Sequence, residues 1–353
     1  RIIMNTKSLR ISNSERLGLI SNLATMLAAG LSLLEIVDAL LEDSKGNQRK
    51  ILETLRADLS QGSRISTSFA KFPQVFDKIT VNLIHASEEA GTLDIILKDL
   101  KENIRKETEF KDKIKSALTY PIFVVVIFIG VLLMILLVVV PKISSIFLRL
   151  NVELPLPTKI LIFSSDLLLR QTILVAGVAV VSLLILVFLY RTQKQLMLGP
   201  LLSLPLISSL ARGIDLARFS RSLYLLLNAG IPITVALELT QEIVIKRDVS
   251  RAIKTSKEMV LSGKKLSEGL KEAKNIFPSI MIKITEAGEK SGSLDRSMQD
   301  ASEYLDYQVS STLNTLISLL EPIMLVVVGI LVGGMMLAII SPIYGIIGQI
   351  GSR

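Results

Sequence analysis

Three long stretches of this sequence contain no charged residue, and they limit the folds that the chain can adopt. They are residues 116–141, 171–190 and 322–352. An α-helix needs about 20 predominantly apolar residues to cross the hydrocarbon core of a bilayer, and each stretch is long enough. The mean hydropathy of the whole chain, +0.54, agrees with this assignment. The sequence therefore predicts a membrane protein with three transmembrane helices.

A fourth uncharged stretch, residues 195–211, is interrupted by Gly199, Pro200 and Pro205. Such interruptions expose backbone groups that lipid cannot satisfy with hydrogen bonds. We expect this stretch to form an elbow near the membrane surface and not a further crossing.

A polar phrase occurs twice in the chain, as EEAGTLD at residues 88–94 and as EKSGSLD at residues 289–295. The same offset of 201 positions places Pro121 on Pro322, where the first and third uncharged stretches begin. Self-similarity at a fixed offset indicates a repeated structural unit. The repeated unit is predicted to be a soluble module followed by a membrane helix.

The soluble parts have the periodicity of α-helices. Apolar residues recur three and four positions apart, and these segments end at glycines such as Gly30 and Gly62,. No alternating β-branched run occurs outside the membrane stretches, so no strand is predicted. The expected fold class is an all-α membrane protein with two repeated cytoplasmic helical-bundle modules and three transmembrane helices.

Basic residues gather next to the first two apolar stretches, so the positive-inside rule places both modules in the cytoplasm,. The predicted segments are a first cytoplasmic helical module at 1–118, transmembrane helices at 119–141, 171–190 and 321–342, a short extracytoplasmic loop at 142–170, a second cytoplasmic helical module at 191–320 and an extracytoplasmic tail at 343–353.

Each polar phrase is predicted to end one helix and begin the next. Gly91 and Gly292 can adopt the left-handed conformation that terminates a helix,. Thr92 and Ser293 can then cap the following helix. Each following helix continues into an apolar stretch.

The helices are expected to enter the membrane at two matching pairs of residues, Tyr120 with Pro121 and Glu321 with Pro322. In the third apolar stretch, Gly329 and Gly333 are four residues apart, as in helices that pack closely in membranes,. Ordinary tolerance of glycine in a lipid-facing helix explains this pair equally well.

Residues that could perform chemistry do not converge in this sequence. His85 is the one histidine and there is no cysteine. The segment LSGKKLS lacks a glycine that a phosphate-binding loop requires. Glu88, Glu89 and Asp94 could bind a cation, but helix capping explains them more simply. We predict no catalytic residue, metal or cofactor, and therefore no enzyme. The net charge of +8 indicates contact with anionic lipid, and no direct binding of nucleic acid is expected.

The second phrase and its flanks resemble the inner-membrane platform proteins of type IV pili and type II secretion, the PilC/GspF family. That family carries two copies of a Gly-Glu-x-Ser-Gly-x-Leu motif. The second copy here matches at Gly288, Glu289, Ser291, Gly292 and Leu294, whereas the first keeps only Glu88, Gly91 and Leu93. Further similar segments, such as SALTYP, ELPLPT and LLEPIMLVVVG, follow in the family's order over most of residues 14–345.

The resemblance implies a multi-pass scaffold in the bacterial inner membrane. Its partners would be a hexameric assembly or retraction ATPase, pilins or pseudopilins, other inner-membrane assembly proteins and the lipid bilayer, and it would form a homo-oligomer. It would couple the ATPase to pilin or pseudopilin assembly. Pilus assembly, secretion and DNA-uptake machines share this component.

One alternative function belongs to another class, the membrane subunit of an ABC-type transporter. EAGEKSG is similar to the cytoplasmic coupling loop of such subunits, but the Ile-x-Leu-Pro that should follow is replaced by SEYL. A chain with only three spans and two repeated soluble modules also differs from the architecture expected of a transporter subunit.

Overall fold

The computed structural model describes residues 9–142, 144–145, 156–171, 177, 181–182 and 205–350. No β-strand occurs among these residues, which confirms the predicted all-α fold class. The chain divides into two compact units. The first unit combines Arg1–Lys113 with Ser208–Thr312, and the second combines Ile114–Ile207 with Leu313–Arg353.

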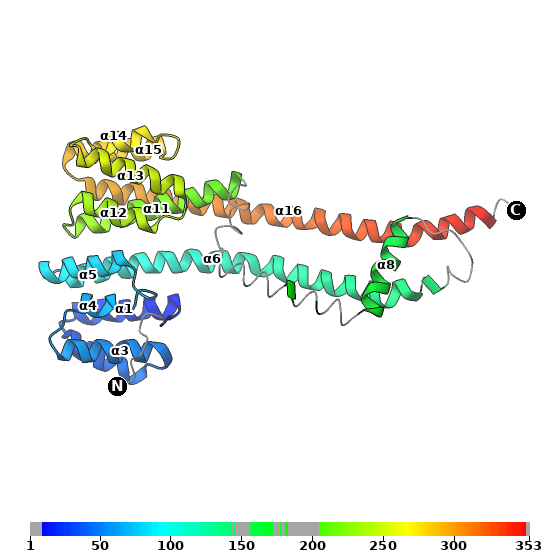
Figure 1. Ribbon diagram of the computed structural model, residues 1–353, viewed down its shortest axis with the longest axis horizontal. Coiled ribbons are helices and arrows are strands. Elements are labelled where there is room, and N and C mark those ends of the chain that lie inside the picture. The colour runs from blue at the N-terminus through cyan, green and yellow to red at the C-terminus, as the bar shows by residue number, and fades with distance from the viewer. Residues whose placement is uncertain are drawn as a thin grey trace. The chain divides into compact units, whose positions relative to one another are not determined.

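Five helices precede the first polar phrase (Figure 1): α1 (Asn13–Ala28), α2 (Leu33–Asp43), α3 (Gly46–Ser60), α4 (Ile65–Ala70) and α5 (Lys78–Ala90). Two of them begin with a capping box, because the first amides of a helix have no partner within it. The Ser12 hydroxyl accepts from the Glu15 amide at 3.2 Å, and the Glu15 carboxylate accepts from the Ser12 amide at 2.6 Å. Ser32 and Glu35 make the same pair of bonds at the start of α2.

From residue 205 onward, five helices likewise lead into the second polar phrase: α11 (Pro205–Asn228), α12 (Ile233–Ile243), α13 (Arg247–Leu261), α14 (Leu266–Glu272) and α15 (Ser279–Ser291). α12, α13 and α15 have 11, 15 and 13 residues, the same lengths as α2, α3 and α5. Three of the five helix pairs therefore have equal lengths, whereas α11 has 24 residues and α1 has 16.

Pro205 begins α11 and does not interrupt it. This differs from the expectation that Pro205 breaks the apolar stretch at 195–211. Proline is favoured at the first position of a helix, where its missing amide hydrogen would have no partner anyway. The part of that stretch before Pro205 lies outside the described residues.

The core of the first unit is made of apolar side chains from both sets of helices. Phe69 stacks on Phe76 with the ring centroids 3.9 Å apart, and Phe219 lies 6.0 Å from Phe277 in a tilted arrangement. All four rings are almost completely buried. In the helices that follow the polar phrases, apolar residues at helical spacing are buried in the same core, at Leu97, Leu100 and Ile104 and at Met298 and Leu305.

Two helices leave the first unit and continue into the second (Figure 1). They are α6 (Leu93–Met134), which passes into a π-helical segment η2 (Ile135–Val139), and α16 (Leu294–Ile350). Among the described residues, two helical stretches, Leu93–Lys142 and Leu294–Gly334, are long and apolar enough to cross a membrane. The third predicted crossing, at 171–190, lies almost wholly outside the described residues.

The segment 142–170, expected to be a short loop, contains helix α8 (Leu156–Arg170). α8 packs against η2, and the buried hydroxyl of Ser165 donates to the carbonyl oxygen of Leu136 at 2.6 Å. A π-helical turn disturbs the regular hydrogen bonds of the helix, so a hydroxyl from a neighbouring helix can supply a donor. Spacing alone did not predict this helix, because it is too short to cross a membrane and begins beside two prolines.

Candidate functional site

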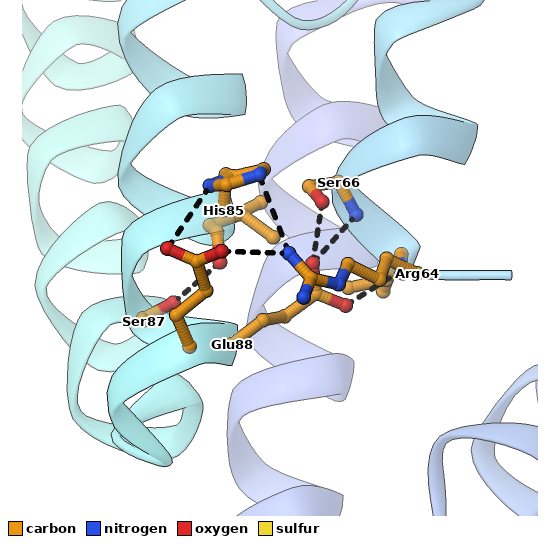
Figure 2. Close-up of polar contacts among 8 residues, drawn as sticks. Arg64, Ser66, His85, Ser87 and Glu88 are labelled. Atoms are coloured by element: carbon orange, nitrogen blue, oxygen red, sulfur yellow. Dashed lines mark hydrogen bonds and ion pairs between the residues drawn. The ribbon is translucent and has the colours of Figure 1, made fainter.

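Glu88, in the first polar phrase, binds the start of a helix that precedes it by more than twenty residues. Its carboxylate accepts hydrogen bonds from the Ile65 amide (2.7 Å), the Ser66 amide (3.2 Å) and the Ser66 hydroxyl (2.5 Å) (Figure 2). These two residues open α4, whose N-cap residue, Arg64, makes no capping bond with its own side chain. A carboxylate is favoured here because the free amides also carry the positive end of the helix dipole. Glu88 therefore fastens α5 to α4.

Glu289 does the same in the second phrase. Its carboxylate accepts from the amides of Leu266 (2.5 Å) and Ser267 (3.2 Å), which open α14. The capping explanation for Glu88 is thus correct, but the helix that it caps lies elsewhere in the chain. A signal was present in the sequence, because both acids stand 23 positions after the first residue that they cap.

The glycine of each phrase ends the helix that comes before it. Gly91 has φ 70° and Gly292 has φ 74°, so both adopt the predicted left-handed conformation. The next residue, Thr92 or Ser293, donates its amide to the carbonyl oxygen five positions earlier, at 2.9 Å in both copies. This 6→1 bond is typical of the Schellman ending of a helix.

The residues after each glycine begin the long helices. Leu93 and Leu294 are partly buried against the core, and Asp94 and Asp295 lie in the first turns of α6 and α16. The hydroxyl of Ser291 contacts that of Ser293 at 2.7 Å. Each phrase thus caps a distant helix, ends one helix and starts another.

Close packing around position 288 requires a glycine there. A Cβ atom at this position would lie 2.2 Å from Oγ and 2.6 Å from Cβ of Ser297, and 3.2 Å from Cα of Leu294. α15 therefore approaches the first turn of α16 too closely for any side chain at this point. The first phrase has Ser87 at the matching position, and its buried hydroxyl donates to the Ile84 carbonyl at 2.9 Å.

A half-exposed polar cluster lies beside Glu88 (Figure 2). The Arg64 guanidinium donates to Glu89 at 2.9 Å and lies 3.4 Å from Nε2 of His85. The bond from Arg64 lowers the pKa of Glu89, and the charge of His85 contributes in the same direction. Both carboxylate oxygens of Glu88 accept hydrogen bonds from amides or from a hydroxyl. The described residues contain no group of three or more side chains that could hold a metal ion.

Asp215, on α11, is a third carboxylate that caps a helix from another element. It is fully buried and accepts from the amides of Ile245 (2.9 Å) and Lys246 (2.7 Å) just before α13. Burial raises its pKa, while the two amides act in the opposite direction. No sequence pattern marks Asp215, because it is a single acid on a largely apolar helix.

Arg221, also on α11, contacts the two long helices within the first unit. Its guanidinium donates to the carboxylate of Asp306 on α16 and, at 3.1 Å, to the side-chain oxygen of Asn103 on α6. The side chain of Arg221 is only 16% exposed, which strengthens the attraction by excluding water. Arg221 therefore joins the helices that follow the two polar phrases. The separations of 118 and 85 positions along the chain explain why spacing did not predict this contact.

The predicted membrane residues lie on the two long helices. Pro121 lies inside α6 and Tyr120 is well exposed, and Glu321 and Pro322 lie inside α16. Nothing lies within 4 Å of a Cβ added at Gly329 or Gly333. Their roles at the membrane boundary and in helix packing stay predictions.

Comparisons with known proteins match both halves of the chain. The family model for protein F of the type II secretion system (T2SS) matches residues 19–141 and again residues 219–342. A type IV pilus assembly protein, PilC of Thermus thermophilus, is 34% identical over 332 residues, which cover 93% of this chain and 81% of that protein. Type II secretion system protein F of Vibrio cholerae is 30% identical over 328 residues, 91% of this chain and 80% of that protein.

Proposed function

The chain belongs to the type II secretion system protein F family, and we propose that it couples a cytoplasmic hexameric ATPase to the assembly of pilins or pseudopilins. In this proposal the chain is a multi-pass platform in the bacterial inner membrane. It performs no catalysis, because the ATPase supplies the energy. Other inner-membrane assembly proteins and further copies of the chain complete the machine. The similarity to relatives that are named for pilus assembly and for type II secretion supports a role in such a machine.

The observation that carries the proposal is the continuity of α6 and α16. Each starts at a left-handed glycine turn against a soluble core and runs without interruption into an apolar segment. From Leu93 to Tyr120 the helix rises roughly 40 Å, at about 1.5 Å per residue. A helix of this length transmits a rotation or shift of its packed end to its apolar end.

We further infer that the chain contains two repeated cytoplasmic modules and three crossings. The shared order of the two helix sets and the equal lengths of three of the five helix pairs support duplication, as does the double match of the family model. Two crossings between the modules would place both on one side of the membrane. Basic residues beside the apolar stretches favour the cytoplasmic side,.

Reporter fusions test this topology. A reporter that is active only outside the cytoplasm should be active when fused after Asn151 or after Arg353. The same reporter should be silent after Ser60 and after Ser262, which lie in the two modules. Activity at either module would show that the proposed orientation is wrong.

The coupling role predicts an effect on a partner enzyme. The purified full-length chain should hydrolyse no ATP, but it should bind the assembly ATPase and change its turnover. Binding and ATP turnover would be measured with the chain in lipid nanodiscs and with empty nanodiscs as the control. ATP turnover by the chain alone, or an unchanged rate of the bound ATPase, would contradict the proposal.

The alternative, a membrane subunit of an ABC-type transporter, gains no support from either comparison. EAGEKSG lies mostly in α15, and the residues after Gly292 form α16. The similarity to a coupling loop therefore ends where the long helix begins.

A further inference from the structure

A polar cavity lies at one end of the second helix set, between α11, α16 and the segment that joins α14 to α15. Its volume is about 260 Å³. The polar residues that line it are Ser209, Arg212, Lys274, Asn275, Gln308 and Thr312. Arg212 and Lys274 are cationic, and none of the lining residues is acidic. The larger cavity beside Arg221, in contrast, is lined by four acidic and four basic residues. The smaller cavity is therefore the one that favours an anion.

Arg212 and Lys274 both retain hydrogen-bonding capacity. Nη1 of Arg212 donates to the carbonyl oxygen of Asn275 at 3.0 Å, and Nη2 lies 3.7 Å from a carboxylate oxygen of Asp248. Nε of Arg212 is buried and has no hydrogen-bond partner within the described part of the chain. The exposed Lys274 makes no ion pair with any described residue. A guanidinium and an ammonium placed in this way suit a phosphate, which accepts several charge-assisted hydrogen bonds.

The cavity also lies where the chain changes from polar to apolar. Arg212 is the first charged residue of α11, and residues 206–211 before it carry no charge. On α16, Asp306 is followed by an uncharged stretch that lasts until Glu321. Both helices that line the cavity thus become apolar directly beyond it, and α16 continues into a segment able to cross a membrane. The cavity therefore lies on the soluble side of the predicted membrane entry at Glu321, nine residues before it on α16.

The first helix set lacks the two cations. With the offset of 201, Pro73 corresponds to Lys274. In the earlier helices an offset of 200 aligns Gly30 with Gly230, and there Ser12 corresponds to Arg212. The cationic pair is therefore a property of the second set alone. A general requirement of the repeated fold would have placed cations at both positions.

We propose that this cavity binds the phosphate of an anionic phospholipid headgroup, held by Arg212 and Lys274. Bound lipid would anchor the end of α11 and the start of the apolar part of α16 at the cytoplasmic surface. Basic pockets at this surface are known to attract anionic lipid. This lipid-site proposal depends on α16 entering the membrane but not on coupling to an ATPase. The lipid-site proposal and the coupling proposal can therefore fail independently of one another.

Native mass spectrometry of the full-length chain in neutral detergent tests the site. Phosphatidylglycerol is added in increasing amounts, and phosphatidylcholine serves as the neutral lipid. The double variant Arg212→Gln/Lys274→Gln should bind phosphatidylglycerol at least about tenfold more weakly than the natural chain, because two charge-assisted contacts are lost. The matched control, Arg251→Gln/Lys254→Gln, removes one arginine and one lysine from the exposed surface of α13 and should bind normally.

Three results would overturn the proposal. The first is equal binding by the double variant and the control variant. The second is equal affinity of the natural chain for phosphatidylglycerol and phosphatidylcholine. The third is complete displacement of phosphatidylglycerol by inorganic phosphate, which would make free phosphate the ligand. Lys274→Ala, at an exposed position, keeps the test valid if the double variant does not fold, and it should also weaken binding.

Discussion

Cells whose only copy of the chain carries four extra glycines between Lys113 and Ile114 are expected to lose surface fibres or secretion. The insertion falls at the boundary between the two compact units. Glycine destabilises a helix by about 1 kcal/mol per residue relative to alanine, so four glycines would interrupt α6 between the core and the apolar segment. A movement of the core would then no longer reach the membrane. Fibres would be counted by electron microscopy, or secretion by assay of the medium.

Four alanines at the same position are the matched control. They add the same length but keep the helix continuous, so fibre assembly should be retained better than with glycine. Membrane level and binding of the ATPase should be equal in both variants. Normal fibre assembly by the glycine variant would show that the chain is a passive anchor, and the coupling proposal would then be abandoned.

Replacing Gly288 with alanine should destabilise the first unit by about 1–3 kcal/mol, the usual range for an overpacked core. The added methyl group would lie 2.2 Å from Oγ of Ser297, so α15 and α16 must separate. The free energy of unfolding would be obtained from denaturant titration of the full-length chain in detergent, followed by circular dichroism. A shift of α15 away from α16 should also disturb the cap that Glu289, on α15, provides to the start of α14.

Two further variants separate this effect from the general cost of losing a glycine. Ser297→Gly in the Gly288→Ala background removes the nearest atoms and should restore part of the stability, although Cα of Leu294 stays close. Gly18→Ala in α1 meets nothing within 4 Å and should be neutral or slightly stabilising, since alanine favours helix. Equal stability of Gly288→Ala and Gly18→Ala would contradict the packing explanation.

The local features of the fold could be predicted from the sequence because their causes are local. Helix ends at Gly30, Gly62, Gly91 and Gly292 follow from the left-handed backbone that glycine permits,. The apolar stripes follow from the helical period. These features depend on residues that lie within a few positions of one another.

The remaining features depend on contacts between distant parts of the chain. The repeated acid was visible as a motif, but its partner at the start of α4 or α14 was not. Arg221 and Asp215 stand in no pattern at all, because each meets its partners only after the helices have packed. Helix α8 has only 15 residues, so its composition does not reveal whether it lies in the membrane or outside it.

The caps made by Glu88 and Glu289 affect the order in which parts of the chain can fold during synthesis. α4 leaves the ribosome before Glu88 does, so its first amides must wait until α5 has followed. Domains fold as units during translation, beginning at the N-terminus, and the first helix set can close once Glu88 emerges, before the apolar part of α6 has left the ribosome. The contact of Asn103 with Arg221 forms only after a further 118 residues. The cap on α4 can therefore form before the contact that joins α6 to α11 exists.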